Sequence, residues 1–451
     1  MAVTASRLGS APITIDWSQM MIKKEPDTEA MGAAWAKLRA RFQSGEVGFY
    51  DCPIQLELSQ VSESQALADS LLRKNSFSDC LFLGIGGSAL GPMSLLSALQ
   101  DRSESGIRFH FIENPDPMEW ASTLKKLKPS STLVCSVTKS GTTFETMAQT
   151  LLALEWLGKE RWKTHLVAIT DPVKGDLRQF VQQEGIPSLA IAPSIGGRFS
   201  VFSPVGLFAA ALAGLSVSSF LGGAKQVRDY LEKTPVEKNP LFILAQEFLN
   251  QSSKRSVHVC MPYSTRLRLL GSWFVQLWGE SLGKDGKGFT PMAAVGATDQ
   301  HSILQLLRDG PDDKVTLFMT IDQVADEVKI PRLPPTLDRK EYPAFKILEG
   351  HTLHGLLATE YQATSLVLTK QGRPHLSFKL DRLDERGLGA LYYTFCVLTA
   401  VTGSLWEVNP FDQPGVEEGK VYIKKSLSVE APPVSEESNA YERLRGTRSE
   451  S

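Results

Sequence analysis

The stretch CLFLGIGGSALGPMSLLSAL, residues 80–99, contains the pattern that decides the fold. An apolar run at 80–83 predicts a buried strand, the glycines after it predict a turn, and residues 89–99 predict a helix. The same order of apolar run, glycine- or hydroxyl-rich turn and longer periodic segment returns along the chain. Such alternation is typical of parallel strands joined by helices, so the sequence predicts an α/β fold.

The repeated pattern also predicts how the chain is divided. Further strands are expected at residues 133–137, 166–169, 189–192, 257–261 and 315–319, and further helices at 144–157 and 267–282. The segment 222–239 turns amphipathic and polar before a new strand–helix series begins at Ser256, which indicates a break. We expect an N-terminal segment (1–48), two α/β domains (49–225 and 226–400) and a C-terminal segment (401–451) that becomes a mobile tail from about Ser426.

Composition excludes several classes of protein. The chain has 451 residues, 42% of them apolar, which suffices for a large core and excludes a disordered or fibrous chain. Its 48 Lys and Arg residues are balanced by 50 Asp and Glu residues, so no basic field favours nucleic acid. Five scattered cysteines without a CxxC spacing indicate a reducing compartment.

Two uncharged stretches approach the length of a membrane span, residues 199–224 and 387–406. Both are rich in Gly, Ser or Thr, and Pro204 interrupts the first. We therefore expect buried helices there and no membrane partner. The first 20 residues lack a continuous apolar segment, so we expect no secretory signal and a cytoplasmic location.

Two turns have the composition of phosphate-binding loops. In GIGGSALGP (84–92), glycines let backbone N–H groups approach an anion at a helix start, although tight packing alone also explains them. Their spacing is not the GxGxxG of a dinucleotide site. VTKSGTT (137–143) offers four hydroxyls and a lysine, which is more than a helix cap needs and suits a phosphate monoester. The lack of GxxxxGK[ST] argues against a nucleoside triphosphate.

Four ionisable residues lie in further motifs. Arg198 in SIGGRFS precedes an uncharged segment, where it serves either a structural ion pair or a substrate oxygen that becomes negative. Glu280 in WGESLGK lies near a helix C-terminus, which raises the proton affinity of a carboxylate, although a surface glutamate is the alternative. His301 in GATDQHS has the best context for acid–base chemistry among seven histidines. Lys420 in FDQPGVEEGK is, by itself, an ordinary surface lysine.

Taken together, these segments resemble the phosphoglucose isomerase family, with the motifs in the same order from Gly84 to Lys420. The resemblance implies two SIS-type doubly wound parallel-sheet domains with a C-terminal helical arm, forming a homodimer that needs no cofactor. It implies reversible isomerisation of glucose 6-phosphate and fructose 6-phosphate in glycolysis and gluconeogenesis. The implied route is ring opening followed by proton transfer through a cis-enediol intermediate.

The resemblance also implies a role for individual residues. Glu280 is the implied base that moves a proton between C2 and C1, and Arg198 is the implied cation beside the cis-enediol. The implied ring-opening pair is Lys420 and His301, the latter reaching across the dimer interface. The backbone of Gly87 is implied to lie close to the substrate. The implied substrate-binding side chains are Ser88, Thr138, Lys139, Ser140, Thr143, Gln276 and Gln413.

Two other interpretations remain open. A non-catalytic sugar-phosphate sensor would use the TKSGTT turn but would have no need of Glu280, His301 and Lys420 together. An isomerase of wider range would also accept mannose 6-phosphate, through pocket details that the sequence does not show. No metal is expected, because His351 and His354 are three residues apart with no further cluster of Cys, Asp or His beside them. A competing hydride shift would need a metal cluster, which the sequence lacks.

Overall fold

The computed structural model describes residues 4–22, 24–54, 59–336 and 342–428. By its internal contacts the chain divides into two compact units, residues 1–411 and 412–451. Within the described residues, the larger unit contains two β-sheets and the smaller unit contains helix α16 (Glu417–Leu427). The expected mobile tail falls mainly on residues 429–451, which lie outside the described residues.

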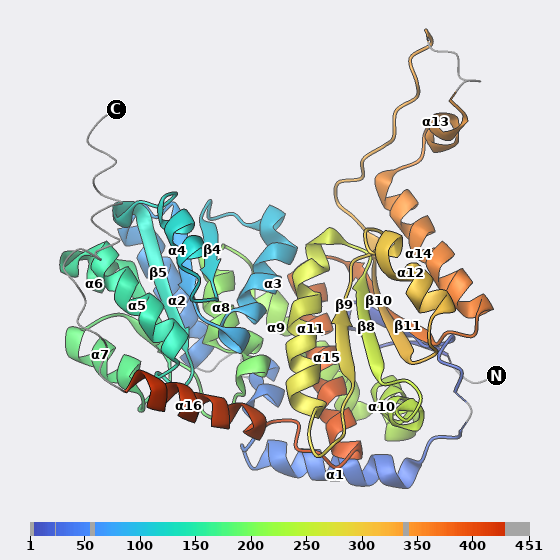
Figure 1. Cartoon of the computed structure of the whole chain (residues 1–451), viewed down its shortest axis with the longest axis horizontal. Helices are drawn as coiled ribbons and strands as arrows, with labels where there is room; N and C mark the ends of the chain where they lie inside the picture. Colours follow the sequence, from blue (N-terminus) through green and yellow to red (C-terminus); the bar gives the residue numbers. More distant parts are fainter. Residues whose placement is uncertain (1–3, 23, 55–58, 337–341, 429–451) are drawn as a thin grey trace. The chain divides into compact units, whose positions relative to one another are not determined.

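The first sheet consists of five parallel strands in the described part of the larger unit (Figure 1). Every residue of its central strands is buried, as their unbroken apolar runs require. The strand order is β4 (Arg108–Ile112), β3 (Asp79–Leu83), β5 (Thr132–Thr138), β6 (Leu166–Thr170) and β7 (Ser188–Ala190). The helices of this region are α2 (Ser59–Lys74), α3 (Leu90–Leu99), α4 (Pro117–Leu124), α5 (Phe144–Leu157), α6 (Trp162–His165), α7 (Asp176–Glu184) and α8 (Pro204–Leu212).

The second sheet has six strands among the described residues and combines distant parts of the chain. Its order is β1 (Ala5–Arg7), β2 (Ile13–Asp16), β11 (His375–Arg382), β10 (Lys314–Gln323), β8 (Val257–Pro262) and β9 (Thr290–Ala293). The last four strands are parallel, whereas the N-terminal hairpin is antiparallel to β11, with Ile15 opposite Phe378. The associated helices are α10 (Pro240–Gln251), α11 (Arg268–Leu282), α12 (Gln300–Asp309), α13 (Pro343–Leu348) and α14 (Leu353–Lys370).

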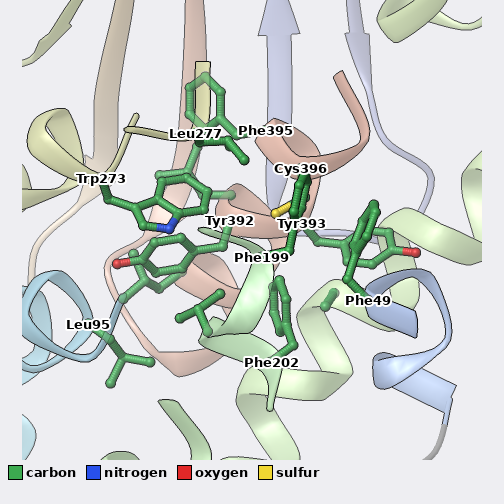
Figure 2. Close-up of a cluster of buried hydrophobic side chains, with 14 of the residues drawn as sticks. Phe49, Leu95, Phe199, Phe202, Trp273, Leu277, Tyr392, Tyr393, Phe395 and Cys396 are labelled. Atoms are coloured by element: carbon green, nitrogen blue, oxygen red, sulfur yellow. The ribbon is translucent and has the colours of Figure 1, made fainter. Parts of the chain in front are cut away.

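Three further helices complete the core, namely α1 (Thr28–Gln43), α9 (Val217–Lys233) and α15 (Glu385–Leu405). Helix α15 packs against the other two and against α10 and α11. Figure 2 shows its Tyr392 and Tyr393 among the rings of Trp273, Phe199 and Phe49. Helix α15 is long and apolar enough to cross a membrane, but 94% of its apolar window is buried inside the protein.

The predicted α/β fold with parallel strands is confirmed, and each expected strand and helix overlaps an observed one. The buried helices expected within 199–224 and 387–406 are also confirmed, since α8 and nearly all of α15 are buried. The segment 222–239, where we expected a break, is helical as far as Lys233. The expected boundaries at 225 and 400 fall inside α9 and α15, and the domain division stays a prediction.

Candidate active site

The hydroxyl-rich turn joins β5 to α5 at the carboxyl edge of the first sheet, where α/β folds place their ligands. Its hydroxyls form one cluster, because Thr143 Oγ1 lies 2.8 Å from Thr138 Oγ1 and 3.3 Å from Ser140 Oγ. Gly141 has a φ of +68° and packs so closely on Gly175 that a methyl group would lie 3.0 Å from its Cα. The tight turn therefore presents several donors in a small volume.

Lys139 connects this turn to the segment that leads to Arg198. Its Nζ donates a hydrogen bond of 2.8 Å to the carbonyl oxygen of Pro193. Burial lowers the pKa of Lys139, the Asp171 carboxylate opposes that change, and the positive charge of Arg198 adds to it. The charges of Lys139 and Arg198 are thus close enough to influence each other.

The glycine-rich turn after β3 packs directly against the backbone that carries Arg198. A methyl group on Gly87 would lie 2.2 Å from the carbonyl carbon of Gly197 and 2.7 Å from the Arg198 nitrogen. Ser200 Oγ donates a 3.0 Å hydrogen bond to the Gly87 carbonyl. A methyl group on Gly84 of the same turn would lie 3.1 Å from the Val137 carbonyl, at the end of β5. Three motifs far apart in sequence therefore meet here, with the half-buried Ser88 in the glycine-rich turn.

Helix α11 carries Glu280, whose carboxylate lies next to Arg198. Its buried stripe has the spacing expected of an amphipathic helix and consists of Leu270, Trp273, Phe274, Leu277, Trp278 and Ser281. Gln276 and Glu280 are four residues apart and interact, with 3.2 Å between Gln276 Nε2 and Glu280 Oε1. A methyl group on Gly86 would lie 2.9 Å from Gln276 Nε2, so the glycine-rich turn also contacts this helix.

Arg198 and Glu280 form the central ion pair of the site. Arg198 is only 2% exposed, yet its Nη1 lies 3.2 Å from Glu280 Oε2. Its Nε donates to Ser281 Oγ at 2.7 Å, and its Nη2 donates to the Pro410 carbonyl at 2.7 Å. The Glu280 side chain keeps 33% of its surface exposed. The arrangement is a fixed cation beside a carboxylate that a ligand can reach, which suits proton transfer next to a developing negative oxygen.

The remaining candidates lie on other parts of the chain. His301 lies exposed in the first turn of α12, and no hydrogen bond joins its imidazole to another described residue. Lys420 and Gln413 belong to the smaller unit, where Lys420 Nζ donates to Glu417 Oε1 at 2.7 Å. Their placement at the site is a prediction that the chain by itself does not test.

Sequence reasoning missed the groups that hold Arg198 in place. Ser281 carried a usable signal, because it continues the apolar stripe of α11 with a hydroxyl, and a buried hydroxyl requires a partner. Pro410 and Pro193 act through backbone carbonyls, which any residue has, so their identity carried no signal.

A family model described as phosphoglucose isomerase matches residues 72–441. The chain belongs to the phosphoglucose isomerase family. A glucose-6-phosphate isomerase of Rubrobacter xylanophilus is 44% identical over 360 residues, which cover 77% of this chain and 82% of the relative. Another, from Carboxydothermus hydrogenoformans, is 36% identical over 412 residues, or 87% of each chain.

Two solved structures share the fold of this chain. A hypothetical protein of Thermus thermophilus has a TM-score of 0.82 and 36% identity, over 89% of this chain and 95% of its own. A glucose-6-phosphate isomerase of Chlamydia trachomatis has a TM-score of 0.79 over 98% of this chain and 93% of its own. At 22% identity, the second comparison shows the shared fold. The resemblance and the enzyme class predicted from the motifs are thus confirmed, whereas the roles of single residues of this phosphoglucose isomerase stay predictions.

Proposed function

We propose that the site around Arg198 and Glu280 catalyses the reversible isomerisation of glucose 6-phosphate and fructose 6-phosphate. The observation that carries the proposal is the 3.2 Å contact between a buried guanidinium and a half-exposed carboxylate. The glycine-rich turn packs both on the backbone of Arg198, through Gly87, and on the end of β5 that leads into the hydroxyl-rich turn, through Gly84, which supports one ligand engaging the pair and that turn. Such a pair suits a 1,2 proton shift, which needs one base and one cation beside the oxygens.

The phosphate of the substrate is bound by the two turns at the carboxyl edge of the first sheet. The hydroxyls of Thr138, Ser140 and Thr143 form a cluster, and a phosphate oxygen would replace the hydrogen bonds within it. Lys139 adds a positive charge beside them. The proposed phosphate ligands are Ser88, Thr138, Lys139, Ser140 and Thr143.

Once the sugar ring is open, the proposed base is the Glu280 carboxylate. It takes the proton from C2 of the aldose, so that the C–H electron pair forms the C1–C2 double bond while the C1=O π pair moves to O1, which takes up a proton to complete the cis-enediol. The same carboxyl group then returns its proton to C1 as O2–H loses its proton and the C2=O bond forms, which gives the ketose; the proton lost from O2 balances the one gained by O1. Arg198 stabilises the negative charge that develops on the substrate oxygens during both steps. Gln276 has a buried Oε1 without a hydrogen-bond partner among the described residues, which supports a contact with a sugar hydroxyl.

Ring opening is assigned to His301 and Lys420, with Gln413 as a further contact to the sugar. His301 is exposed and its imidazole is unpaired within the described chain, which supports its use in the site of a second subunit. We infer a homodimer in the cytoplasm without a membrane or nucleic-acid partner, and the reaction needs neither a metal nor a cofactor.

The proposal is tested by replacing Glu280 with glutamine, which keeps the shape of the side chain and removes the base. We expect kcat to fall by about 10²- to 10⁴-fold with little change in KM, the usual effect of removing a positioned acid–base group. Turnover of fructose 6-phosphate is followed by coupled oxidation of the glucose 6-phosphate formed, with and without a chelator.

A matched control is Glu184→Gln, since Glu184 also ends a helix but lies outside the site. We expect this control to retain the wild-type rate. Near-normal turnover by Glu280→Gln would exclude Glu280 as the base.

A further inference from the structure

The buried stripe of α11 ends in a polar residue that the reaction scheme has not used. The stripe runs through Leu270, Phe274 and Leu277, and at its next position Ser281 is 0% exposed. An apolar residue would suit this position for packing alone. The hydroxyl instead accepts a 2.7 Å hydrogen bond from Arg198 Nε, so it has a specific partner in the active site.

This contact and a second one both constrain the orientation of the Arg198 guanidinium. Nε donates to Ser281 Oγ and Nη2 donates to the Pro410 carbonyl, each at 2.7 Å. The Pro410 segment is itself held, because Lys284 Nζ donates to the Asn409 carbonyl at 2.6 Å and to the Ser281 carbonyl at 2.9 Å. Short hydrogen bonds from Nε and from Nη2 to neutral acceptors thus constrain the plane of the guanidinium.

The constrained plane limits how Arg198 meets the base. Nη1 lies 3.2 Å from Glu280 Oε2, which is longer than the 2.7–2.9 Å usual for a charge-assisted bond. The other oxygen of Glu280 faces Gln276 instead, again at 3.2 Å. The carboxylate is therefore not held in the two-pronged pair that a free guanidinium forms with a carboxylate.

We propose that Ser281 is a positioning residue, which prevents Arg198 from closing onto Glu280 and keeps the guanidinium directed at the substrate oxygens. The proposal rests on the proposed function of Arg198 and Glu280. Ser281 touches neither the substrate nor the reacting atoms and acts through Arg198 alone. Loss of Ser281 should therefore weaken stabilisation of the transition state, in which the orientation of the Arg198 guanidinium matters, and should leave substrate binding nearly unchanged.

The test is Ser281→Ala, which removes the acceptor of the Arg198 Nε–H and lets the guanidinium turn toward Glu280. We expect kcat to fall by about 10- to 100-fold, the range for a hydrogen bond to a charged group, with KM within about twofold. Ser281→Cys retains a weaker acceptor of similar size, so its kcat should lie between those of serine and alanine. Ser64→Ala is the matched control, since Ser64 is equally buried and hydrogen-bonded within α2.

A double-mutant cycle separates positioning from a merely structural role. Arg198→Lys keeps the charge but removes the Nε–H that Ser281 accepts, so adding Ser281→Ala should cost no further kcat. An equal loss in both backgrounds, or an unchanged kcat in Ser281→Ala, would overturn the positioning role. The same assay is first applied to the wild-type protein. Absence of isomerase activity there would overturn the proposed function and not the positioning role. If Ser281→Ala does not fold, Ser281→Cys replaces it in the cycle. A lower kcat with Arg198 but not with Arg198→Lys would then support the positioning role, and an equal loss in both would overturn it.

Discussion

The buried imidazole of His258 should make the folding stability of the protein depend on pH. This effect is separate from any pH dependence of the catalytic rate. His258 on β8 is 0% exposed and stacks on Phe289 with ring centroids 4.0 Å apart. Neither of its ring nitrogens has a hydrogen-bond partner among the described residues. Burial lowers the pKa of His258 to about 3, so the ring is neutral in the folded protein at physiological pH.

The resulting prediction concerns acid stability. Below about pH 6.5 the unfolded chain binds a proton at His258 that the folded protein does not accept until about pH 3. The free energy of unfolding should therefore decrease as the pH falls through this range, by at most about 1.4 kcal/mol per pH unit for one proton. His258→Phe should remove this contribution, measured by urea unfolding at pH 7 and pH 5. Equal decreases in the variant and the wild type would contradict it.

At the scale of single residues, the chemistry-bearing side chains were easier to predict than the groups that hold them. Arg198 and Glu280 were predicted from their motifs, and the structure joins them at 3.2 Å. The close contact of Gly87 with Gly197 could not be predicted, because glycine in a turn has several explanations and sequence gives no distance between turns. Ser281 was visible only as an irregularity in an apolar stripe.

At the scale of elements, the hydroxyl-rich turn should contribute to substrate affinity more than to the rate of the chemical step. Its contacts with a phosphate are alike in the ground and transition states, because the phosphate is remote from the reacting carbons. Thr143→Val keeps the branched shape and removes the hydroxyl that lies 2.8 Å from Thr138 Oγ1. We expect KM for fructose 6-phosphate to rise about 10-fold with kcat nearly unchanged, and Lys139→Ala to raise KM further.

Inhibition by inorganic phosphate provides the second measurement for this turn. Phosphate should compete with the substrate in the wild type and inhibit both variants less. Thr164→Val, outside the turn on α6, is the control and should behave as wild type. If KM and phosphate inhibition stay unchanged in both turn variants, the phosphate site lies elsewhere.

Strands with a continuous apolar run were predicted, whereas β4, β9, β11 and the two N-terminal strands were not. The strands β3, β5 and β6 are buried at every residue and read as continuous apolar runs. By contrast, β4 is exposed or half-buried at most positions, and β9 has no buried residue. Such strands are defined by their neighbours across the sheet, and local periodicity does not reveal them.

At the scale of the whole molecule, pairing between distant segments limits what a single sequence predicts. No strand was predicted within the N-terminal residues 1–48, yet β2 aligns Asp16 with Ser377. The four-residue strand β2 is too short for a clear pattern, and nothing local indicates a partner more than 350 residues away. The same limitation applies to His301, since its proposed site lies on another subunit.

The shared site is testable by mixing two inactive enzymes. Glu280→Gln and His301→Ala chains, each nearly inactive, are dissociated or unfolded together in equal amounts and reassembled at random. If His301 acts across a two-fold interface, half of the dimers are mixed, and each mixed dimer has one site with both changes and one site with neither. About a quarter of the wild-type activity should then return. Each variant treated alone should recover none, which controls for contamination by refolded wild type. If His301 acts within its own subunit, every site retains one change, so a mixture without recovery would exclude the shared site and leave the isomerase assignment intact.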